Sequence, residues 1–102
     1  MKMPPLLKRV KGAVCDYKVV LGGTDETNAG ECVLTPTHGE IRISPVYPLE
    51  YQWQTFFHEW IHKLEEEGGF KLKDDPGDSD VNRLATAIFA DYRRNRWTLP
   101  GA

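Results

Sequence analysis

The sequence predicts a small α+β domain, in which a short antiparallel β-sheet of two or three strands packs on two consecutive amphipathic helices. Its length of 102 residues suits a single domain with one hydrophobic core. In the first half of the chain, apolar and polar residues alternate with the period of two that is typical of half-buried strands. In the second half, apolar residues recur at the spacing of one helical face. These three observations together predict the fold class.

The strands are expected in the first half of the chain. The residues from Ala13 to Leu21 alternate and are rich in β-formers, and Gly22-Gly23 ends the run. Glu31–Thr35 is a second candidate strand, and Pro36–Gly39 after it has the composition of a turn. Glu40–Ser44 alternates cleanly, with its two isoleucines on one side. Successive runs joined by short turns predict a β-meander.

Two amphipathic helices are expected in the second half. The first has apolar residues at positions i, i+3, i+4, i+7, i+8 and i+11, and Gly68-Gly69 ends it. These apolar positions are Trp53, Phe56, Phe57, Trp60, Ile61 and Leu64. The same spacing recurs after an acidic loop, at Val81, Leu84, Ala85, Ile88, Phe89 and Tyr92. Asp78 or Ser79 can cap the start of this second helix.

The chain divides into one domain and two short flanking segments. Residues 1–12 carry four basic and no acidic side chains together with two prolines, which predicts a flexible basic arm. Residues 13–97 form the single domain, and residues 98–102 form a C-terminal tail. Trp97 is expected to pack the end of the domain onto its body, and Glu65–Glu67 to form a solvated helix end.

Composition argues against several classes of function. Thirteen basic against fifteen acidic residues give a net charge of −2, which argues against a dedicated nucleic-acid binder. No apolar run approaches the ~18 residues needed to span a membrane, and the N-terminus lacks the long apolar stretch of a secretory signal. Cys15 and Cys32 are too few for a disulfide framework. We therefore interpret them as reduced thiols and expect a cytoplasmic protein.

The motif that carries chemistry is His58-Glu59-Trp60-Ile61-His62, an H-E-x-x-H sequence within the first helix. Residues four apart lie one above the other on a helix, so the two imidazoles can hold one zinc ion. Glu59 beside them can take a proton from zinc-bound water. On a helical projection, His58 and His62 lie about 140° and 180° from Trp53, away from the main apolar face. This direction argues against two core histidines and leaves exposed surface histidines as the alternative.

A zinc site of this kind needs a third protein ligand, and the acidic loop between the helices supplies the candidates. This loop contains Asp74, Asp75, Asp78 and Asp80. Asp78 lies one turn before Val81, on the side of the second helix that is expected to face the first, and is the favoured ligand. Asp80 lies about 100° to the flank of that face and is the alternative third ligand.

Two stretches resemble the small intracellular zincins of the ImmA/IrrE-like group, which occur in phages and mobile elements. Thr55–His62 resembles their active helix, and Asp78–Ala85 is similar to an acidic-x-acidic-Ala-Asn-x-Phe-Ala pattern on their next helix. The resemblance covers roughly residues 40–92 and implies a minimal zincin-like domain. It also implies that a carboxylate of the second stretch is the third metal ligand. Glu40–Ser44 resembles the family's edge strand, which in related metallopeptidases pairs with the extended substrate.

These residues together predict a zinc-dependent metallopeptidase that hydrolyses peptide bonds in a protein or peptide substrate. One zinc ion per chain, held by His58, His62 and an aspartate, activates a water molecule. Glu59 acts as the general base and then passes the proton to the leaving amine. No oxyanion stabiliser is obvious from the sequence. The candidates are His38, Tyr47, Tyr51 and Tyr92, and a role in packing or on the surface explains each of them more simply.

Two alternatives remain open at this point. The first is the same fold without catalysis, a zincin-like protein-binding module such as a phage accessory or regulatory protein. The intact Glu59 disfavours it, because a purely structural site has no use for a base. The second is a metal-free interaction domain that binds an acidic partner through Arg93, Arg94 and Arg96. A helix terminus explains these charges more simply.

Overall fold

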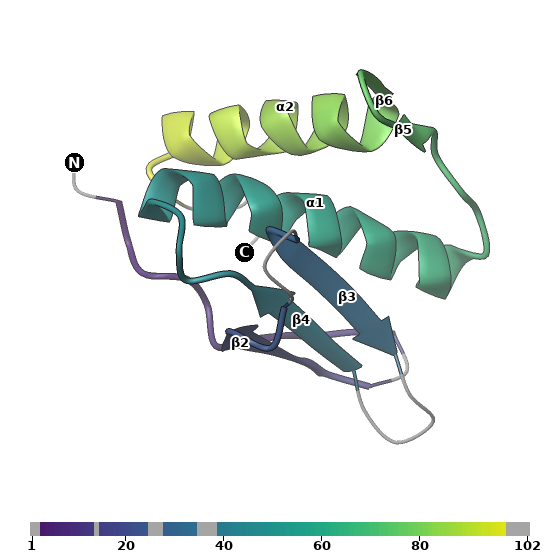
Figure 1. Cartoon of the computed structure of the whole chain (residues 1–102), viewed down its shortest axis with the longest axis horizontal. Helices are drawn as coiled ribbons and strands as arrows, with labels where there is room; N and C mark the ends of the chain where they lie inside the picture. Colours follow the sequence, from purple (N-terminus) through teal and green to yellow (C-terminus); the bar gives the residue numbers. More distant parts are fainter. Residues whose placement is uncertain (1–2, 14, 25–27, 35–38, 98–102) are drawn as a thin grey trace.

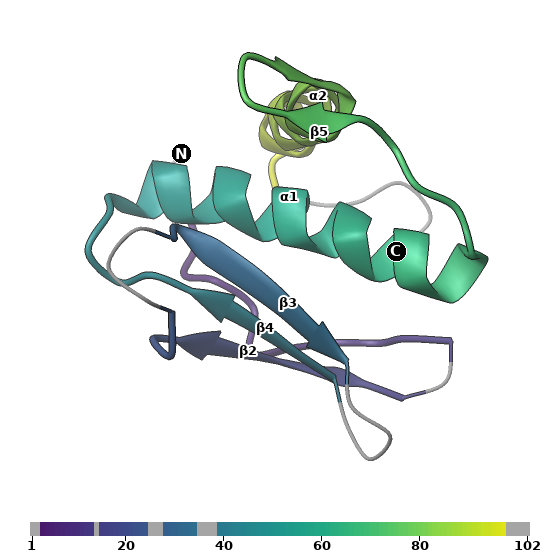
Figure 2. The same cartoon turned by 45° about the vertical axis from the view of Figure 1, so that its right-hand side comes forward.

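The chain folds into a four-stranded sheet, a long helix across one face of the sheet and a second helix on top of the first (Figures 1 and 2). This computed structural model describes residues 3–13, 15–24, 28–34 and 39–97. Its elements are β1 (Arg9–Val10), β2 (Tyr17–Leu21), β3 (Gly30–Leu34), β4 (Gly39–Ile43), α1 (Leu49–Gly68), β5 (Asp74–Asp75), β6 (Asp78–Ser79) and α2 (Asp80–Arg94). The predicted α+β class with two amphipathic helices is confirmed. Within the described residues, neither helix combines the length and the apolar character needed to cross a membrane.

The sheet has the strand order β1-β2-β4-β3 and is mixed rather than antiparallel. β2 and β4 run parallel, with Tyr17 opposite Gly39 and Leu21 opposite Ile43. The other two pairs, β1 with β2 and β3 with β4, are antiparallel. The predicted meander is therefore wrong, because β4 lies between β2 and β3. This central strand carries Ile41 and Ile43, both fully buried in the core.

β3, and not β4, is the edge strand that lies beside α1 (Figure 1). The segment expected at the edge, Glu40–Ser44, corresponds to the central strand β4, and this expectation is wrong. The backbone N–H of Ser44 donates a 2.8 Å hydrogen bond to the carbonyl of Ala29. Because antiparallel hydrogen bonding alternates along a strand, Gly30 and Cys32 direct their backbone groups away from β4, to an edge that pairs with no other described strand.

The described part of the N-terminal arm contacts the body of the domain. Arg9–Val10 forms β1, and the indole Nε1 of Trp53 donates a 2.8 Å hydrogen bond to the carbonyl of Pro4. The backbone N–H of Ala13 donates to a carboxylate oxygen of Glu67. The apolar residues of the arm that pack against the core are Met3, Leu6 and Val10. These apolar contacts attach the arm, while Lys8, Arg9 and Lys11 are exposed.

α1 forms the middle layer, with the sheet on one side and α2 on the other (Figure 2). The core comprises Tyr17, Ile41, Ile43, Trp53, Phe56, Phe57, Ile61, Val81, Ala85, Phe89 and Tyr92. The apolar spacing of α2 places Leu84 on the same face as the core residues, but Leu84 is 43% exposed. α2 packs mainly against α1 and buries only the part of its apolar face that carries Val81, Ala85, Phe89 and Tyr92. Trp97 packs against the rings of Trp53, Phe89 and Tyr92, as predicted. The predicted tail, residues 98–102, lies outside the described residues.

On the sheet side of α1, a buried lysine forms an ion pair with a partly buried glutamate. Lys63 is only 3% exposed, and its Nζ lies 2.7 Å from Oε1 of Glu67 and 5.5 Å from the centroid of the Tyr17 ring. This ammonium group holds the pKa of Glu67 below its usual value. Burial raises the pKa of Tyr17 to about 12. Glu65 is buried as well, so the end of α1 is not the solvated segment that the run of three glutamates predicts.

Candidate metal centre

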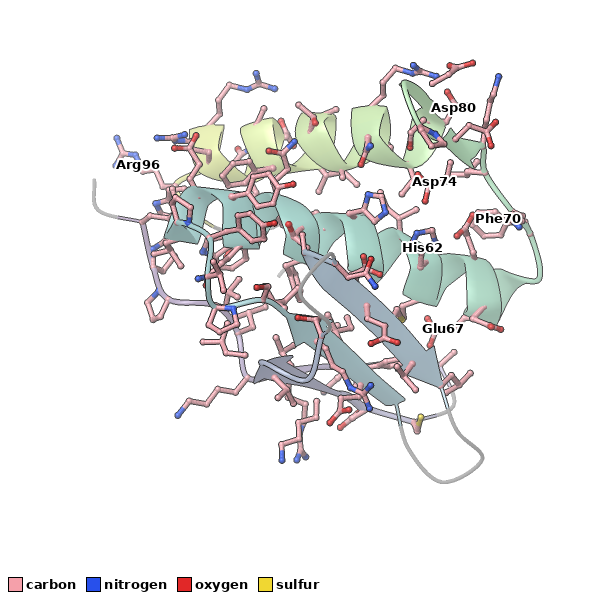
Figure 3. All side chains as sticks on the ribbon, in the orientation of Figure 1. His62, Glu67, Phe70, Asp74, Asp80 and Arg96 are labelled. Carbon is pink, nitrogen blue, oxygen red and sulfur yellow. The ribbon has the colours of Figure 1, made fainter. Side chains whose placement is uncertain are left out.

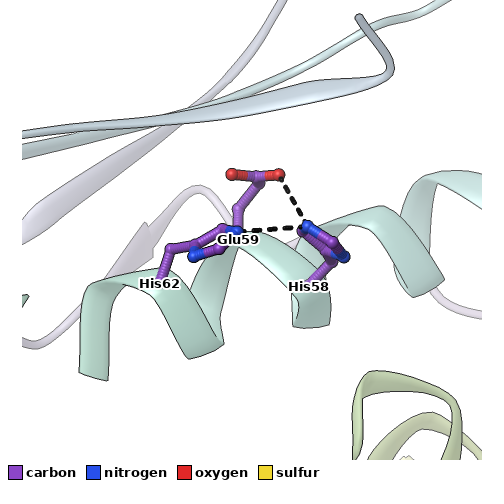
Figure 4. Close-up of side chains that lie close together, drawn as sticks. All are labelled: His58, Glu59 and His62. Carbon is purple, nitrogen blue, oxygen red and sulfur yellow. Dashed lines mark hydrogen bonds and ion pairs between the residues drawn. The ribbon is translucent and has the colours of Figure 1, made fainter. Parts of the chain in front are cut away.

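The H-E-x-x-H motif lies in the middle of α1, where regular helix on both sides determines the directions of its side chains. α1 begins after Pro48 and ends at Gly69, which adopts the left-handed conformation with a φ of 68°. Figure 4 shows the imidazoles of His58 and His62 facing each other, while the carboxylate of Glu59 points towards the strands. Both histidines are partly exposed, as their predicted direction requires.

The two imidazoles approach each other through their Nε2 atoms, which are 3.2 Å apart. Each uses its other ring nitrogen for a hydrogen bond. Nδ1 of His58 lies 2.6 Å from Oδ1 of Asn82 on α2, and Nδ1 of His62 lies 2.6 Å from Oε1 of Glu65. Because both partners are acceptor oxygens, these contacts favour a proton on each Nδ1, and in that tautomer Nε2 carries the lone pair. This is the tautomer that metal-ligating histidines have when an oxygen orients them.

Asp74 brings a carboxylate to the same point. Its Oδ2 lies 3.4 Å from Nε2 of His58 and 3.2 Å from Nε2 of His62. Its Oδ1 accepts a 2.6 Å hydrogen bond from the hydroxyl of Ser79. Figure 3 shows Asp74 and His62 next to each other, between α1 and the hairpin of β5 and β6. Burial would raise the pKa of Asp74, but the Ser79 hydrogen bond and the two histidines hold it below its usual value.

The structure does not bring Asp78 or Asp80, the two predicted third ligands, to the histidines. Asp78 forms ion pairs with Lys73 and Arg83, and Asp80 lies 2.6 Å from the Arg83 guanidinium. Both aspartates are exposed, and Asp80 lies beyond Asp74 on the outer side of the hairpin (Figure 3). The structure therefore offers Asp74 in place of Asp78 and Asp80.

The short hairpin of β5 and β6 explains this difference. Asp74 pairs with Ser79 and Asp75 with Asp78, and Gly77 in the turn has a φ of 78°, which suits glycine. The hairpin folds Asp74 back beside the start of α2, where Ser79 caps the helix by accepting a 3.0 Å hydrogen bond from the N–H of Asn82. The predicted cap at Ser79 is thus confirmed. In this register Asp74 faces α1, and Asp78 is exposed.

The spacing of these three atoms matches the spacing of ligand atoms around one zinc ion. They form a nearly equilateral triangle with sides of 3.2, 3.2 and 3.4 Å. In a tetrahedral zinc shell with bonds of about 2.0–2.1 Å, neighbouring ligand atoms are about 3.3–3.4 Å apart. Three lone pairs that converge without a cation repel one another. A proton would bridge only two of the three atoms, whereas a metal ion satisfies all three, and two imidazoles with one carboxylate are typical zinc ligands.

Glu59 lies on the sheet side of α1 and is only 7% exposed. Its Oε2 is 4.0 Å from Nε2 of His58, which is longer than any side of the ligand triangle. Burial raises the pKa of Glu59, while the two histidines oppose that shift. A Cβ atom on Gly30 of β3 would lie 2.5 Å from Cγ2 of Thr55 and 3.1 Å from Cγ of Glu59. The missing side chain at Gly30 therefore lets the edge strand approach α1 at the candidate base.

Two open clefts flank the ligand triangle along α1. A cleft of about 420 Å³ lies beside His58 and Glu59, between the start of β3 and the start of α2. A second cleft of about 610 Å³ lies beside His62, towards the C-terminal end of α1. An extended chain that passes the triangle can therefore place residues in both clefts.

The four candidate oxyanion stabilisers have different positions. Tyr51 lines the cleft beside His58, and Tyr47 stacks on Tyr51 with ring centroids 4.7 Å apart. Tyr92 is buried in the core among aromatic rings and does not line either cleft. His38 lies outside the described residues.

Sequence reasoning missed the residues that orient the ligands. Glu65 had a signal, because it follows His62 by three residues and so lies on the same side of the helix. Pro76-Gly77, between two pairs of polar residues, is a turn signal that favours a hairpin. A hairpin at this point brings Asp74 back beside the start of the second helix. The spacing of Asn82 does not relate it to the motif on α1, but Asn82 matches the Asn of the acidic-x-acidic-Ala-Asn-x-Phe-Ala pattern that Asp78–Ala85 resembles.

Comparison of the chain with protein-family models, with curated proteins and with solved structures finds no match. The resemblance to ImmA/IrrE-like zincins stays a prediction, and function has to be inferred from the chemistry of the site.

Proposed function

We propose that the protein is a zinc-dependent metallopeptidase of the cytoplasm, which binds one zinc ion per chain and hydrolyses peptide bonds in a protein or peptide substrate. The proposal rests on the positions of three atoms: Nε2 of His58, Nε2 of His62 and Oδ2 of Asp74 lie 3.2–3.4 Å from one another. Three protein ligands with one open position are the composition of a catalytic zinc site. Oε2 of Glu59 lies 4.0 Å from Nε2 of His58, which leaves it close enough to contact a water molecule on a zinc ion bound at this point.

In the proposed mechanism, Glu59 transfers protons, and Asn82 and Glu65 orient the two histidines. A zinc ion at this point would lower the pKa of a bound water molecule towards ~7 and polarise the substrate carbonyl. Glu59 accepts a proton from the attacking water, and its buried position favours the protonated form that results. The same carboxylic acid then donates the proton to the leaving amine. Asn82 and Glu65 hold the imidazoles in place through their Nδ1 atoms, so the ligands do not have to reorient.

The free edge of β3 is the proposed binding place for the substrate backbone. β3 lies beside α1, and Gly30 and Cys32 direct backbone groups away from β4. An extended peptide that adds to this edge gains main-chain hydrogen bonds and passes Glu59, which lies against Gly30.

Metal analysis combined with one substitution tests the proposal. Wild-type protein and Glu59→Gln are dialysed with zinc, their metal content is measured by elemental analysis, and a peptide mixture is incubated with each. We expect about one zinc per chain in both proteins and a loss of cleavage of about 10²- to 10⁴-fold in the variant, since a general base contributes that much. His62→Ala should lose the metal.

The outcomes separate the alternatives. Bound zinc without cleavage that depends on Glu59 would contradict an enzyme and favour the zincin-like binding module. No zinc under either condition would contradict the metal centre itself.

A further inference from the structure

The cleft beside His58 has an aromatic wall that the proposed mechanism does not use. Tyr51 lines this cleft and is 46% exposed. Tyr47 stacks against it, with ring centroids 4.7 Å apart and planes inclined by 36°. The side-chain Nε2 of Gln52 donates a 2.8 Å hydrogen bond to the carbonyl of Tyr47, which ties that residue to the first turn of α1. The Tyr51 ring is therefore held in place by its neighbour while it remains accessible from the cleft.

The two clefts differ in charge. Apart from His58 and Glu59, the described residues that line the Tyr51 cleft are neutral, among them Gln54 and Asn82. The cleft beside His62, in contrast, is lined by Glu65, Glu66 and Lys71. A charged side chain that enters the Tyr51 cleft loses water, and only the proposed base and the proposed zinc site offer it a charged partner there. A neutral side chain has no such cost, so charge favours a neutral group in this cleft.

We infer that the Tyr51 cleft is the specificity pocket of the proposed metallopeptidase and takes an aromatic side chain next to the bond that is cut. The inference rests on the proposed function and names its substrate class. An aromatic side chain gains a ring contact with Tyr51 beyond the apolar area that it buries. The cleft volume of about 420 Å³ is within the usual range of ligand pockets and leaves room for one ring. The cleft adjoins His58 and Glu59, so the ring lies within one residue of the reacting bond.

Cleavage of an unbiased peptide mixture tests this inference. Peptides from a digested proteome are incubated with zinc-loaded protein, and the cut bonds are identified by mass spectrometry. We expect aromatic residues to be enriched over alanine about tenfold at one position within one residue of the cut. Among the bonds that are still cut, Tyr51→Ala should lose the enrichment, whereas Tyr51→Phe, which retains the ring, should keep it. Leu84→Ala removes another exposed apolar side chain, on α2, and serves as the matched control that keeps both cleavage and enrichment.

Glu59→Gln separates failure of the pocket from failure of the enzyme. Cleavage that Glu59→Gln abolishes, but that shows no aromatic preference or prefers basic residues, would overturn the pocket and leave the peptidase intact. An aromatic preference that survives in Tyr51→Ala would also overturn the assignment. Cleavage that is absent from the wild type, or unchanged in Glu59→Gln, would overturn the peptidase and the pocket together.

Discussion

Replacement of Asp74 by alanine tests the metal centre most directly, because it removes one corner of the ligand triangle without changing α1. The lost oxygen lies 3.4 Å and 3.2 Å from the two Nε2 atoms. Structural zinc sites bind with about 10–16 kcal/mol, which is about 2.5–4 kcal/mol for each of four ligands. Since about 1.4 kcal/mol is a factor of ten, we expect the zinc affinity of Asp74→Ala to fall by about 100-fold or more.

Asp78→Ala is the matched control, with the same chemical change in the same hairpin. The Asp78 side chain is 54% exposed, and its ion pairs with Lys73 and Arg83 lie on the surface. Such pairs contribute about 0–1 kcal/mol to stability, so the hairpin should survive and zinc affinity should change by less than about twofold. Competition with a chromogenic zinc chelator at pH 7 measures both affinities, and circular dichroism shows that both variants fold. Weak binding by Asp78→Ala together with normal binding by Asp74→Ala would refute the geometry and support the ligand predicted from the sequence.

Three further substitutions test the surroundings of the centre. Glu65→Gln weakens the hydrogen bond that orients the second histidine, and we expect zinc affinity to fall about 10- to 100-fold in the chelator competition; an unchanged affinity would exclude this orienting role. Lys63→Met leaves the partly buried Glu67 without its cation and should lower the free energy of unfolding in urea by about 1.5–3 kcal/mol, the contribution of a hydrogen bond to a charged group. Because the folded-state pKa of Glu67 is lowered, the pair stabilises the fold fully above the unfolded-state pKa of about 4.3, and this contribution is lost as the pH falls through the folded-state pKa. A difference between wild type and Lys63→Met that stays constant down to pH 2 would contradict this account. Gly30→Ala places a Cβ atom 2.5 Å from the Thr55 side chain of α1 and should cost about 1–3 kcal/mol of stability. It should also slow peptide cleavage at unchanged zinc content. An unaltered cleavage rate would show that β3 does not position the base.

Both helices could be predicted from the sequence because a helical face is a local pattern. The spacing of apolar residues on α1 and the stop at Gly69 involve contacts within a few residues. The order of the strands is not local. β2 pairs with β4, although β3 lies between them in the sequence. The two isoleucines of β4 would show the same alternation in an edge strand as in a central strand. The alternation therefore predicts a strand but does not determine its neighbours.

The same contrast holds within the candidate site. His58, Glu59 and His62 lie on one helix, so their relative positions follow from helical geometry. The prediction of Asp78 as the third ligand, in contrast, assumes that α2 extends back to this residue. α2 begins only at Asp80, and Asp78 belongs to a hairpin strand in which helical phase has no meaning. The position of Asp74 depends on the register of two-residue strands, which the helical pattern does not contain.

Glu65 connects the helix to the segment that carries the third ligand, which explains why a carboxylate is buried near the end of α1. Oε1 lies 2.6 Å from Nδ1 of His62, and Oε2 accepts a 2.6 Å hydrogen bond from the backbone N–H of Leu72, two residues before Asp74. A carboxylate at this end of a helix is opposed by the helix dipole and by burial. Charge-assisted hydrogen bonds to both oxygens offset that cost, and a cation held by His62 and Asp74 would offset more of it. One side chain thus orients one candidate ligand and anchors the segment of another, so the triangle depends on Glu65 as well as on its own corners.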